Sequence, residues 1–352
     1  MSRKLLSYTA LGLILGNTAF ADVPKVAVDI APVHSLVSRV MEGVGTPELV
    51  IPAGASPHGY SLRPSEAKAL QDADMIIWMG EDLAPWMENS IETLSKNADV
   101  ITLLEESETK LLDFREGALF EEHDHGDHDD HDDHDDHDDH DDHDDHDDHD
   151  KDHDDHDDHD HDKDHDDHDD HDDHGDHDEH AHGEHDPHAW LSIENAQTWL
   201  NLVAGKLSAA DPENAGVYFA NAAEARAEID ALVKEVNSIL EPVRGRNFVV
   251  FHDAYQYFET SFDFPAAGAI SLGDASDPSA ARIAEIQDRV KDEGINCVLS
   301  EPQYNPNLVA TVLSGTDAKT GVIDPLGASL EPGSNLYGDL IRNMAKSLAG
   351  CL

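Results

Sequence analysis

The sequence predicts an α/β fold with two lobes, each a mostly parallel sheet flanked by helices, and one long rigid helix joining them. Short apolar runs alternate with helical segments along most of the chain, and this alternation is typical of parallel sheets. One helical segment, at residues 211–241, is much longer than the others. A tract of His and Asp at residues 121–186 interrupts the alternation, and we expect it to be a disordered insertion.

The first 21 residues have the features of a secretory signal peptide. Arg3 and Lys4 precede an apolar run at 11–15 and the A-x-A cleavage site Ala19-Phe20-Ala21. The apolar run is shorter than the roughly 20 residues that a membrane-spanning helix needs. We therefore expect residues 1–21 to be removed and the mature chain to be exported to the periplasm without insertion into the membrane.

Residues 22–210 are predicted to form the N-terminal lobe, apart from the insertion. Continuous apolar runs there indicate buried strands, and segments with helical spacing follow them. The expected strands lie at 26–30, 48–51, 75–80 and 100–103, and the expected helices at 33–41, 64–72 and 193–209.

Residues 242–352 are predicted to form the C-terminal lobe, where the alternation resumes. The linking helix before it is expected to begin at Asp211-Pro212-Glu213, because Asp is a good N-cap and Pro fits the first turn. At 1.5 Å per residue this helix would be roughly 40 Å long, enough for a rigid rod between lobes. The later strands are expected at 248–251, 269–271, 297–300 and 321–324, and the later helices at 280–293, 308–314 and 337–348.

The insertion repeats Asp-Asp-His almost without interruption, as in residues 128–134. Imidazoles and carboxylates at this density are ligands of transition metals, and the tract has too little apolar content to fold by itself. A helix would bring Asp pairs together at i, i+3 and i, i+4, where they repel one another. We expect a disordered tract that collects metal ions, because an acidic spacer would not need histidine.

Acidic residues outnumber basic ones by 77 to 22, and the formal net charge is −55. Nucleic acid is therefore not an expected partner. The chain outside the insertion is acidic as well, which suits a protein that handles cations.

Histidines outside the insertion form the main candidate site. His58, His188 and His252 lie where a predicted strand or loop meets a helix, and ligands of parallel sheets bind at the carboxyl ends of the strands. Asp324, at the end of the last predicted strand, is a fourth candidate. Three imidazoles and one carboxylate match the ligand types and the ligand number of zinc.

Three other polar residues near these junctions are expected to have different roles. His34 lies just inside a predicted helix, and we expect a surface or capping role for it. Glu301 and Asp253 are expected to cap helices or to support the ligands without touching the metal.

The chain has two cysteines, Cys297 and Cys351. In an oxidising compartment an even pair indicates a disulfide, which would tie a buried strand to the C-terminal end. A metal role is not expected, because neither has a nearby Cys or His at ligand spacing.

Five segments carry a recognisable pattern, namely Gly54–Ser65, Asp186–Leu191, Phe251–Tyr255, Ser300–Gln303 and Ile323–Gly327. They resemble the signatures of the ZnuA family, the periplasmic zinc-binding proteins of ABC zinc importers. The resemblance extends over the mature chain apart from the insertion, whose composition is itself typical of the family. It implies two α/β lobes joined by a long helix, a zinc ion held in the cleft by His58, His188 and His252, delivery to a membrane permease, and a bridge from Cys297 to Cys351.

Two details of the resemblance bear on the metal. Manganese-binding relatives have a glutamate in place of the third histidine, so His252 favours zinc. Some zinc-binding relatives have a Glu immediately before the first histidine, where this chain has Pro57. The fourth ligand is therefore either Asp324 or water.

Other functions stay open at this point. A zinc hydrolase would use three His ligands and an open water position, but the sequence has no H-E-x-x-H or comparable motif, so we do not expect an enzyme. A metal buffer or an adhesin without a transporter partner is the second alternative. The expected protein is a monomer that captures Zn²⁺ as its transported ligand and delivers it to the permease of an ABC importer.

Overall fold

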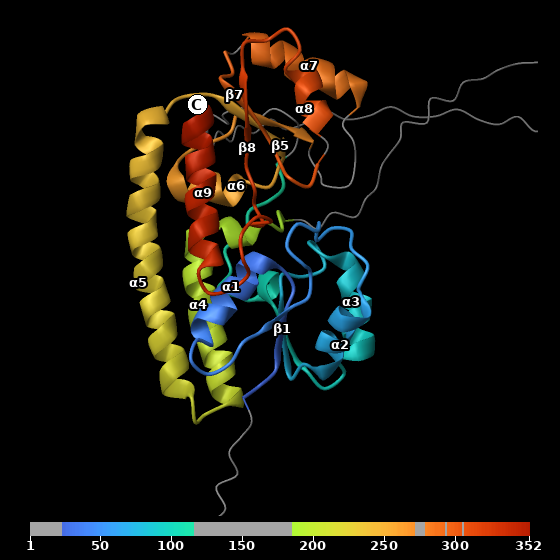
Figure 1. Ribbon diagram of the computed structural model, residues 1–352, viewed down its shortest axis with the longest axis vertical. Coiled ribbons are helices and arrows are strands. Elements are labelled where there is room, and N and C mark those ends of the chain that lie inside the picture. Colours follow the sequence, from blue (N-terminus) through green and yellow to red (C-terminus); the bar gives the residue numbers. More distant parts are fainter. Residues whose placement is uncertain (1–22, 116–184, 272–278, 293, 305) are drawn as a thin grey trace, which may run out of the picture. The chain divides into compact units, whose positions relative to one another are not determined.

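The computed structural model describes residues 23–115, 185–271, 279–292, 294–304 and 306–352 (Figure 1). The predicted signal peptide and nearly all of the predicted insertion lie outside these residues. The described strands form two four-stranded parallel sheets, and helices flank them. The predicted fold class is confirmed.

The first sheet has the strand order β2-β1-β3-β4, with every strand parallel to its neighbours. β1 and β3 lie at its centre and are buried along their whole length. Strands covered on both faces have no solvent side, which explains their unbroken apolar sequences. The four strands are β1 (Val26–Val28), β2 (Glu48–Leu49), β3 (Met75–Trp78) and β4 (Asp99–Thr102).

Prolines lie at the first or second position of three of the helices that accompany this sheet. Proline suits this position because the first helical N–H groups have no partner within the helix. The fourth helix has a Ser192 cap, whose hydroxyl accepts a hydrogen bond from the Asn195 N–H. The helices are α1 (Ala31–Val40), α2 (Pro64–Asp72), α3 (Pro85–Leu94) and α4 (Ile193–Ala210), with short 3-10 turns at Leu103–Glu105 and Ala189–Leu191.

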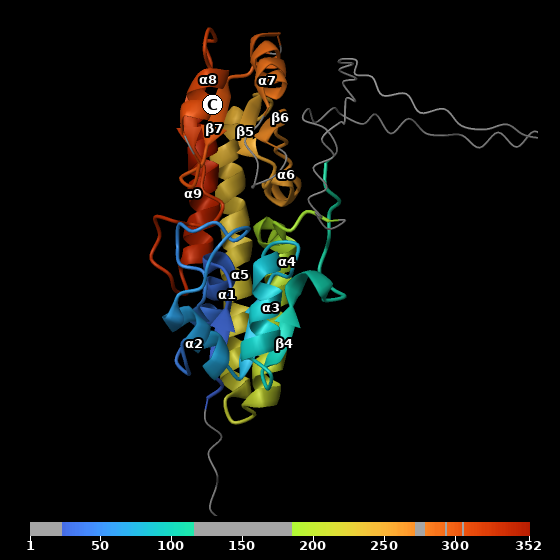
Figure 2. The ribbon, with the colours of Figure 1, turned by 90° about the vertical axis from the view of Figure 1, so that its right-hand side faces the viewer.

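The long helix α5 (Ala215–Leu240) begins later than the sequence predicts. Asp211 is not its N-cap: the residue ends α4, and its carboxylate accepts hydrogen bonds from the Asn214 amide and the Tyr218 hydroxyl. These contacts turn the chain between the two helices, so Asn214 takes the cap position. α5 packs against α1 and α4, which precede it in the chain, and against α9 (Leu336–Cys351), which follows it, as Figures 1 and 2 show.

The second sheet repeats the pattern with the order β6-β5-β7-β8, again parallel throughout. Helix α6 (Gln256–Phe262) was not predicted from the sequence. The other elements are β5 (Phe248–His252), β6 (Gly268–Ser271), α7 (Ala280–Asp292), β7 (Cys297–Ser300), α8 (Pro306–Val312), β8 (Lys319–Val322) and a 3-10 turn at Glu241–Val243.

The predicted disulfide is confirmed. Cys297 and Cys351 are bonded, with their Cα atoms 5.7 Å apart and a sequence separation of 54. The bond joins the first residue of β7 to the last residue of α9. It therefore anchors the C-terminal helix to the second sheet.

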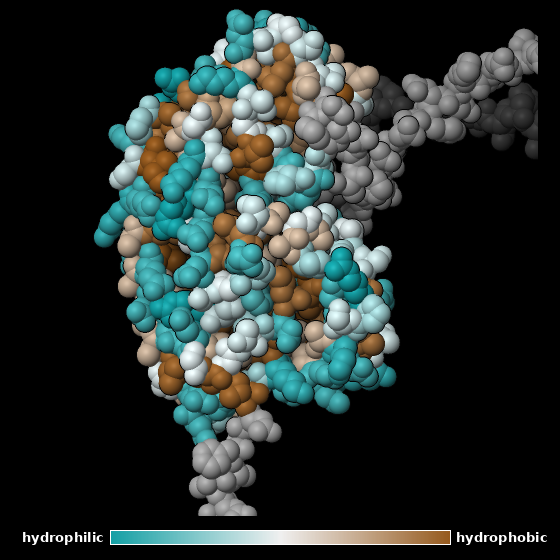
Figure 3. All heavy atoms as spheres, in the orientation of Figure 1, coloured by the Kyte–Doolittle hydropathy of each residue, from teal (hydrophilic) through white to brown (hydrophobic). Residues whose placement is uncertain are grey.

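The outer surface of the long helices is largely hydrophilic. Figure 3 shows mainly hydrophilic residues over α5 and α9, with apolar residues scattered among them. The buried residues of α5 recur at helical spacing and face the neighbouring helices. Within the described ranges, no helix has the length and apolar character needed to cross a membrane.

Candidate metal centre

Three segments that are far apart in sequence bring His58, His188 and His252 next to one another. The ring centres of His58 and His188 are 5.5 Å apart, and those of His188 and His252 are 5.3 Å apart. All three side chains line one small cavity. Two imidazoles bound to the same tetrahedral zinc ion, with Zn–N bonds of about 2 Å, have ring centres about 5 Å apart, so the observed spacing fits a shared ion.

Each histidine is fixed by the element beside it. His252 is the last residue of the buried strand β5, and His188 caps the short turn before α4. His58 is half-buried in the loop after β2, where the Trp86 indole donates a 2.7 Å hydrogen bond to the Pro57 carbonyl. The rings therefore approach one another because their loops are held by regular structure.

Asp186 orients the His188 ring. Its Oδ1 lies 2.7 Å from His188 Nδ1 and also accepts a 2.9 Å hydrogen bond from the His188 backbone N–H. The opposite ring nitrogen, Nε2, is buried and has no hydrogen-bond partner among the described residues. With Nδ1–H donating to the carboxylate, Nε2 presents a lone pair, which is the form of imidazole that binds a metal ion.

Glu301 holds His252 in the same way. Its Oε1 lies 2.5 Å from His252 Nδ1, and both side chains are almost fully buried. Burial lowers the pKa of His252 to about 3 and raises the pKa of Glu301 to about 8. The expectation that Glu301 supports a ligand agrees with this contact.

Asp324 has a different environment from the three histidines. Its Oδ1 accepts hydrogen bonds from the backbone N–H groups of Leu326 and Gly327, and its Oδ2 accepts one from Ala328. Pro325 and Leu326 line the histidine cavity, whereas Asp324 does not. The carboxylate thus shapes the loop that forms one wall of the cavity.

The three imidazoles lie near one another but do not form a complete set of metal ligands. In the part of the chain that the structure describes, no three His, Cys, Asp or Glu side chains stand close enough to hold a metal ion as they are.

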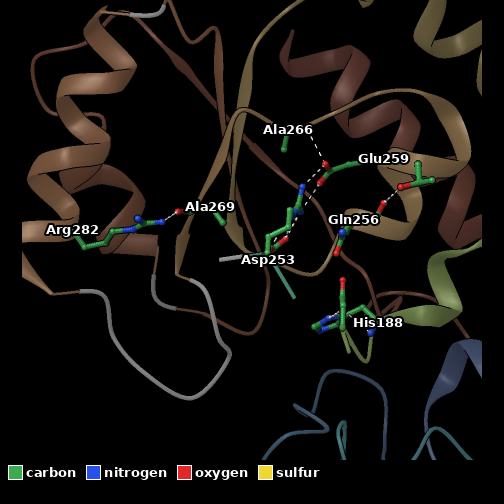
Figure 4. Close-up of polar contacts among 10 residues, drawn as sticks. His188, Asp253, Gln256, Glu259, Ala266, Ala269 and Arg282 are labelled. Atoms are coloured by element: carbon green, nitrogen blue, oxygen red, sulfur yellow. Dashed lines mark hydrogen bonds and ion pairs between the residues drawn. The ribbon is translucent and has the colours of Figure 1, made fainter. Parts of the chain in front are cut away.

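Two sequence expectations near the site need correction. His34 is not at the surface: it is 5% exposed, and its Nε2 lies 3.0 Å from the Pro47 carbonyl oxygen. Asp253 is not the N-cap of α6, which is Tyr255, and the described contacts of its carboxylate are with Arg115, which also binds Glu259. Figure 4 shows the Asp253 and Glu259 side chains near each other. Both residues were misread because their partners are distant in sequence.

Asp186 and Gln303 belong to this site but were not predicted from the sequence. Asp186 stands two residues before His188, a spacing that allows a side chain to reach the ring, so the Asp-Pro-His motif contained a usable signal. Gln303 lines the cavity from the loop after β7, and its Oε1 is buried without a partner in the described chain. Gln303 ends the Ser300–Gln303 segment that resembles the family, but the resemblance gave it no role in the site.

Comparison with known proteins gives a consistent result. The sequence matches the ZnuA family, described as zinc-uptake complex component A, periplasmic, over residues 26–351. It is 45% identical over 350 residues to the high-affinity zinc uptake system protein ZnuA of Paracoccus denitrificans, covering 98% of each chain. The ZnuA protein of Brucella abortus is also 45% identical, over 96% of this chain and 94% of its own.

A solved structure extends the agreement to the fold. A crystal structure of ZnuA superposes with a TM-score of 0.66 at 18% identity, covering 94% of this chain and 99% of the other. At that identity the likeness concerns the fold alone, whereas the family match and the close relatives cover nearly the whole sequence. The chain belongs to the ZnuA family of periplasmic zinc-uptake components.

Proposed function

We propose that this protein captures zinc in the periplasm through His58, His188 and His252 and delivers it to the membrane permease of an ABC importer. The observation that carries this proposal is the buried His188 Nε2, which faces a cavity shared with two other imidazoles and lacks a hydrogen-bond partner among the described residues. A bound cation satisfies that lone pair, and three neutral imidazoles suit zinc.

The family and the close relatives support the transport role. The two relatives at 45% identity are named high-affinity zinc uptake system proteins. This family is one of solute capture and not of catalysis, so zinc is cargo here. A buffer or adhesin without a transporter remains the alternative, and a growth test of the gene deletion in zinc-depleted medium separates the two.

We propose that water, and not Asp324, occupies the fourth coordination position. Three backbone N–H groups already bind the Asp324 carboxylate, and moving it to an ion would break the turn at residues 324–328. Zinc sites with three protein ligands commonly hold a water molecule in the fourth position. Such a ligand leaves readily, which suits an ion that must be handed on.

The remaining assignments follow from the sequence and the family. We propose that residues 1–21 are cleaved on export, that residues 22–210 and 242–352 act as two lobes about the helix at 211–241, and that the tract at 121–186 binds additional ions weakly. The chain is proposed to act as a monomer, with no nucleic-acid partner.

Competition titration with a chelator tests the ligand set. Replacing His58, His188 or His252 by Ala should each weaken zinc binding by orders of magnitude, because a ligand bond is lost. His34→Gln is the matched control, since His34 is buried outside the cavity, and it should keep the affinity of the native chain. Native affinity in all three Ala variants would refute the assignment.

A further inference from the structure

The wall of the histidine cavity contains more unpartnered polar atoms than one metal ligand explains. His188 Nε2, Glu301 Oε2 and Gln303 Oε1 are all buried and have no hydrogen-bond partner in the described ranges. The three residues line the same cavity. Buried polar groups are normally paired, because leaving one unpaired costs stability, so three in one cavity point to a missing guest.

The chemistry of these atoms restricts that guest. His188 Nε2 and Gln303 Oε1 can only accept: the first because Nδ1 carries the proton shared with Asp186, the second because it is an amide oxygen. A zinc ion satisfies the imidazole nitrogen. It does not suit the neutral amide oxygen equally well, since such oxygens are ligands preferred by harder ions such as Ca²⁺.

A water molecule on the ion resolves the mismatch. Its lone pair is committed to the metal, so it presents two O–H donors and needs acceptors around it. We infer that Gln303 is a positioning residue of the proposed zinc site, with its Oε1 accepting a hydrogen bond from the water at the fourth coordination position. This inference rests on the proposed function, and Glu301 Oε2 is the second group available to that water.

The loop that carries Gln303 is held firmly over the cavity. The neighbouring Tyr304 ring stacks on Phe251 with centres 4.5 Å apart and meets the edge of His252 at 5.4 Å. On the other side, Glu301 is tied to His252. Gln303 therefore lies between Glu301 and Tyr304, which both contact residues of β5. These contacts restrict the position of the Gln303 side-chain amide relative to the imidazoles.

The arrangement has a consequence for ion selection. Hydrogen-bond acceptors placed for one water molecule favour zinc, which needs only four ligands. They are less suited to Mg²⁺, which needs six ligands and keeps several waters. Gln303 would thus contribute to the selection of zinc without touching it.

The test uses the full chain with Zn²⁺ as the only added ligand, at one ion per protein. Gln303→Met keeps the length of the side chain but removes the acceptor, and it should weaken zinc binding ten- to a hundredfold while one tight ion is still bound. Gln303→Glu keeps an oxygen acceptor and should restore affinity to within about threefold of the native chain. Gln197→Met on α4 is the control outside the cavity and should change nothing.

Zinc X-ray absorption measures the number and type of the zinc ligands, which a purely structural role of Gln303 would leave unrelated to the bound water. The Gln303→Met protein should keep four light-atom ligands, because water remains on the metal. Loss of the fourth ligand in this variant would mean that Gln303 binds zinc itself, and native affinity in Gln303→Met would mean that it does not hold the water; either result overturns the inference. Failure of the proposed function is distinguishable, since His188→Ala would then bind zinc as tightly as the native chain.

Discussion

At the scale of single residues, carboxylates decide which nitrogen each imidazole offers to an ion. Asp186 and Glu301 each bond the Nδ1 atom of a histidine. A carboxylate in this position also raises the basicity of the ring and so strengthens its bond to a metal. The affinity of the proposed zinc site should therefore depend on two residues that are not among its proposed ligands.

Replacing Asp186 by Asn should weaken zinc binding by ten- to a hundredfold, because a neutral amide orients and polarises the His188 ring less strongly. Chelator competition measures this. The chain offers a matched control in Asp113→Asn, since Asp113 bonds the ring of His185 in the same way but is exposed to solvent. Equal affinity for the Asp186 variant and the control would contradict the role given to Asp186.

The sequence predicted the three histidines and a supporting role for Glu301, but it did not predict the parts played by Asp186 and Gln303, for a physical reason. A histidine that follows a strand of a parallel sheet can be placed at the carboxyl edge from the strand pattern alone. The contact between Glu301 and His252 joins residues 49 positions apart. Whether Gln303 Oε1 finds a hydrogen-bond partner depends on which described residues pack around it. Such properties exist only once the chain is packed.

At the scale of elements, the end of β1 is joined to β3 by a buried carboxylate. Asp29 accepts 2.7 Å hydrogen bonds from the backbone N–H groups of Ile30 and Met79. Burial raises the pKa of Asp29 to about 7, although these hydrogen bonds oppose the shift. The folded protein therefore keeps the proton over a range in which the unfolded chain has lost it.

The stability contribution of Asp29 should fall as the pH rises from about 4 to about 7. A folded pKa above the unfolded one favours the folded state fully at low pH, and this advantage is lost as the pH approaches the folded value. Urea unfolding of native chain and Asp29→Asn over this range measures it: the free energy of unfolding of the native chain should decline relative to the variant. A difference that does not vary with pH would rule the shift out, and the exposed Asp99→Asn serves as control.

The elements also show where sequence patterns are sufficient. β3 was predictable because an unbroken run of apolar residues between turns is typical of a strand covered on both faces of a parallel sheet. The start of α5 was not, since Asp211 is chemically a good cap and only its contacts with Asn214 and Tyr218 draw it away. The preference of Asp211 for the cap position is outweighed there by its hydrogen bonds with side chains three and seven residues further on.

Joint replacement of Cys297 and Cys351 by Ala should lower the free energy of unfolding by about 4 kcal/mol, the value that the chain-entropy model gives for a closed loop of this length. The loop spans 54 residues and includes β7, β8 and most of α9. Urea titration of the oxidised native chain and of the double variant checks the figure. A loss below about 1 kcal/mol would indicate that the bond constrains little in the unfolded chain.

At the scale of the whole molecule, the question is how the His/Asp-rich tract relates to the site. The two chain segments that lead into it are paired: Asp113 and His185 form an antiparallel bridge, and the Asp186 N–H donates to the Leu112 carbonyl at 2.8 Å. The Tyr257 hydroxyl of α6 bonds both Leu112 and Asp186. The base of the tract is thus anchored within the folded part, beside His188.

Deleting residues 122–184 should therefore leave the fold and one tight zinc site intact, because the paired segments need only a short connection to close. The full chain should bind further ions weakly, since each ion must order its own ligands along the tract and so opposes conformational entropy that the cavity has already lost in folding. Repulsion within a segment that carries most of the net charge of −55 is relieved by divalent ions, so this weak binding should also decrease with added salt more than the tight site does. Calorimetry on both proteins at two salt concentrations separates the classes: a tight site that disappears with the tract would show that the tract supplies a primary ligand, contrary to the assignment of His58, His188 and His252.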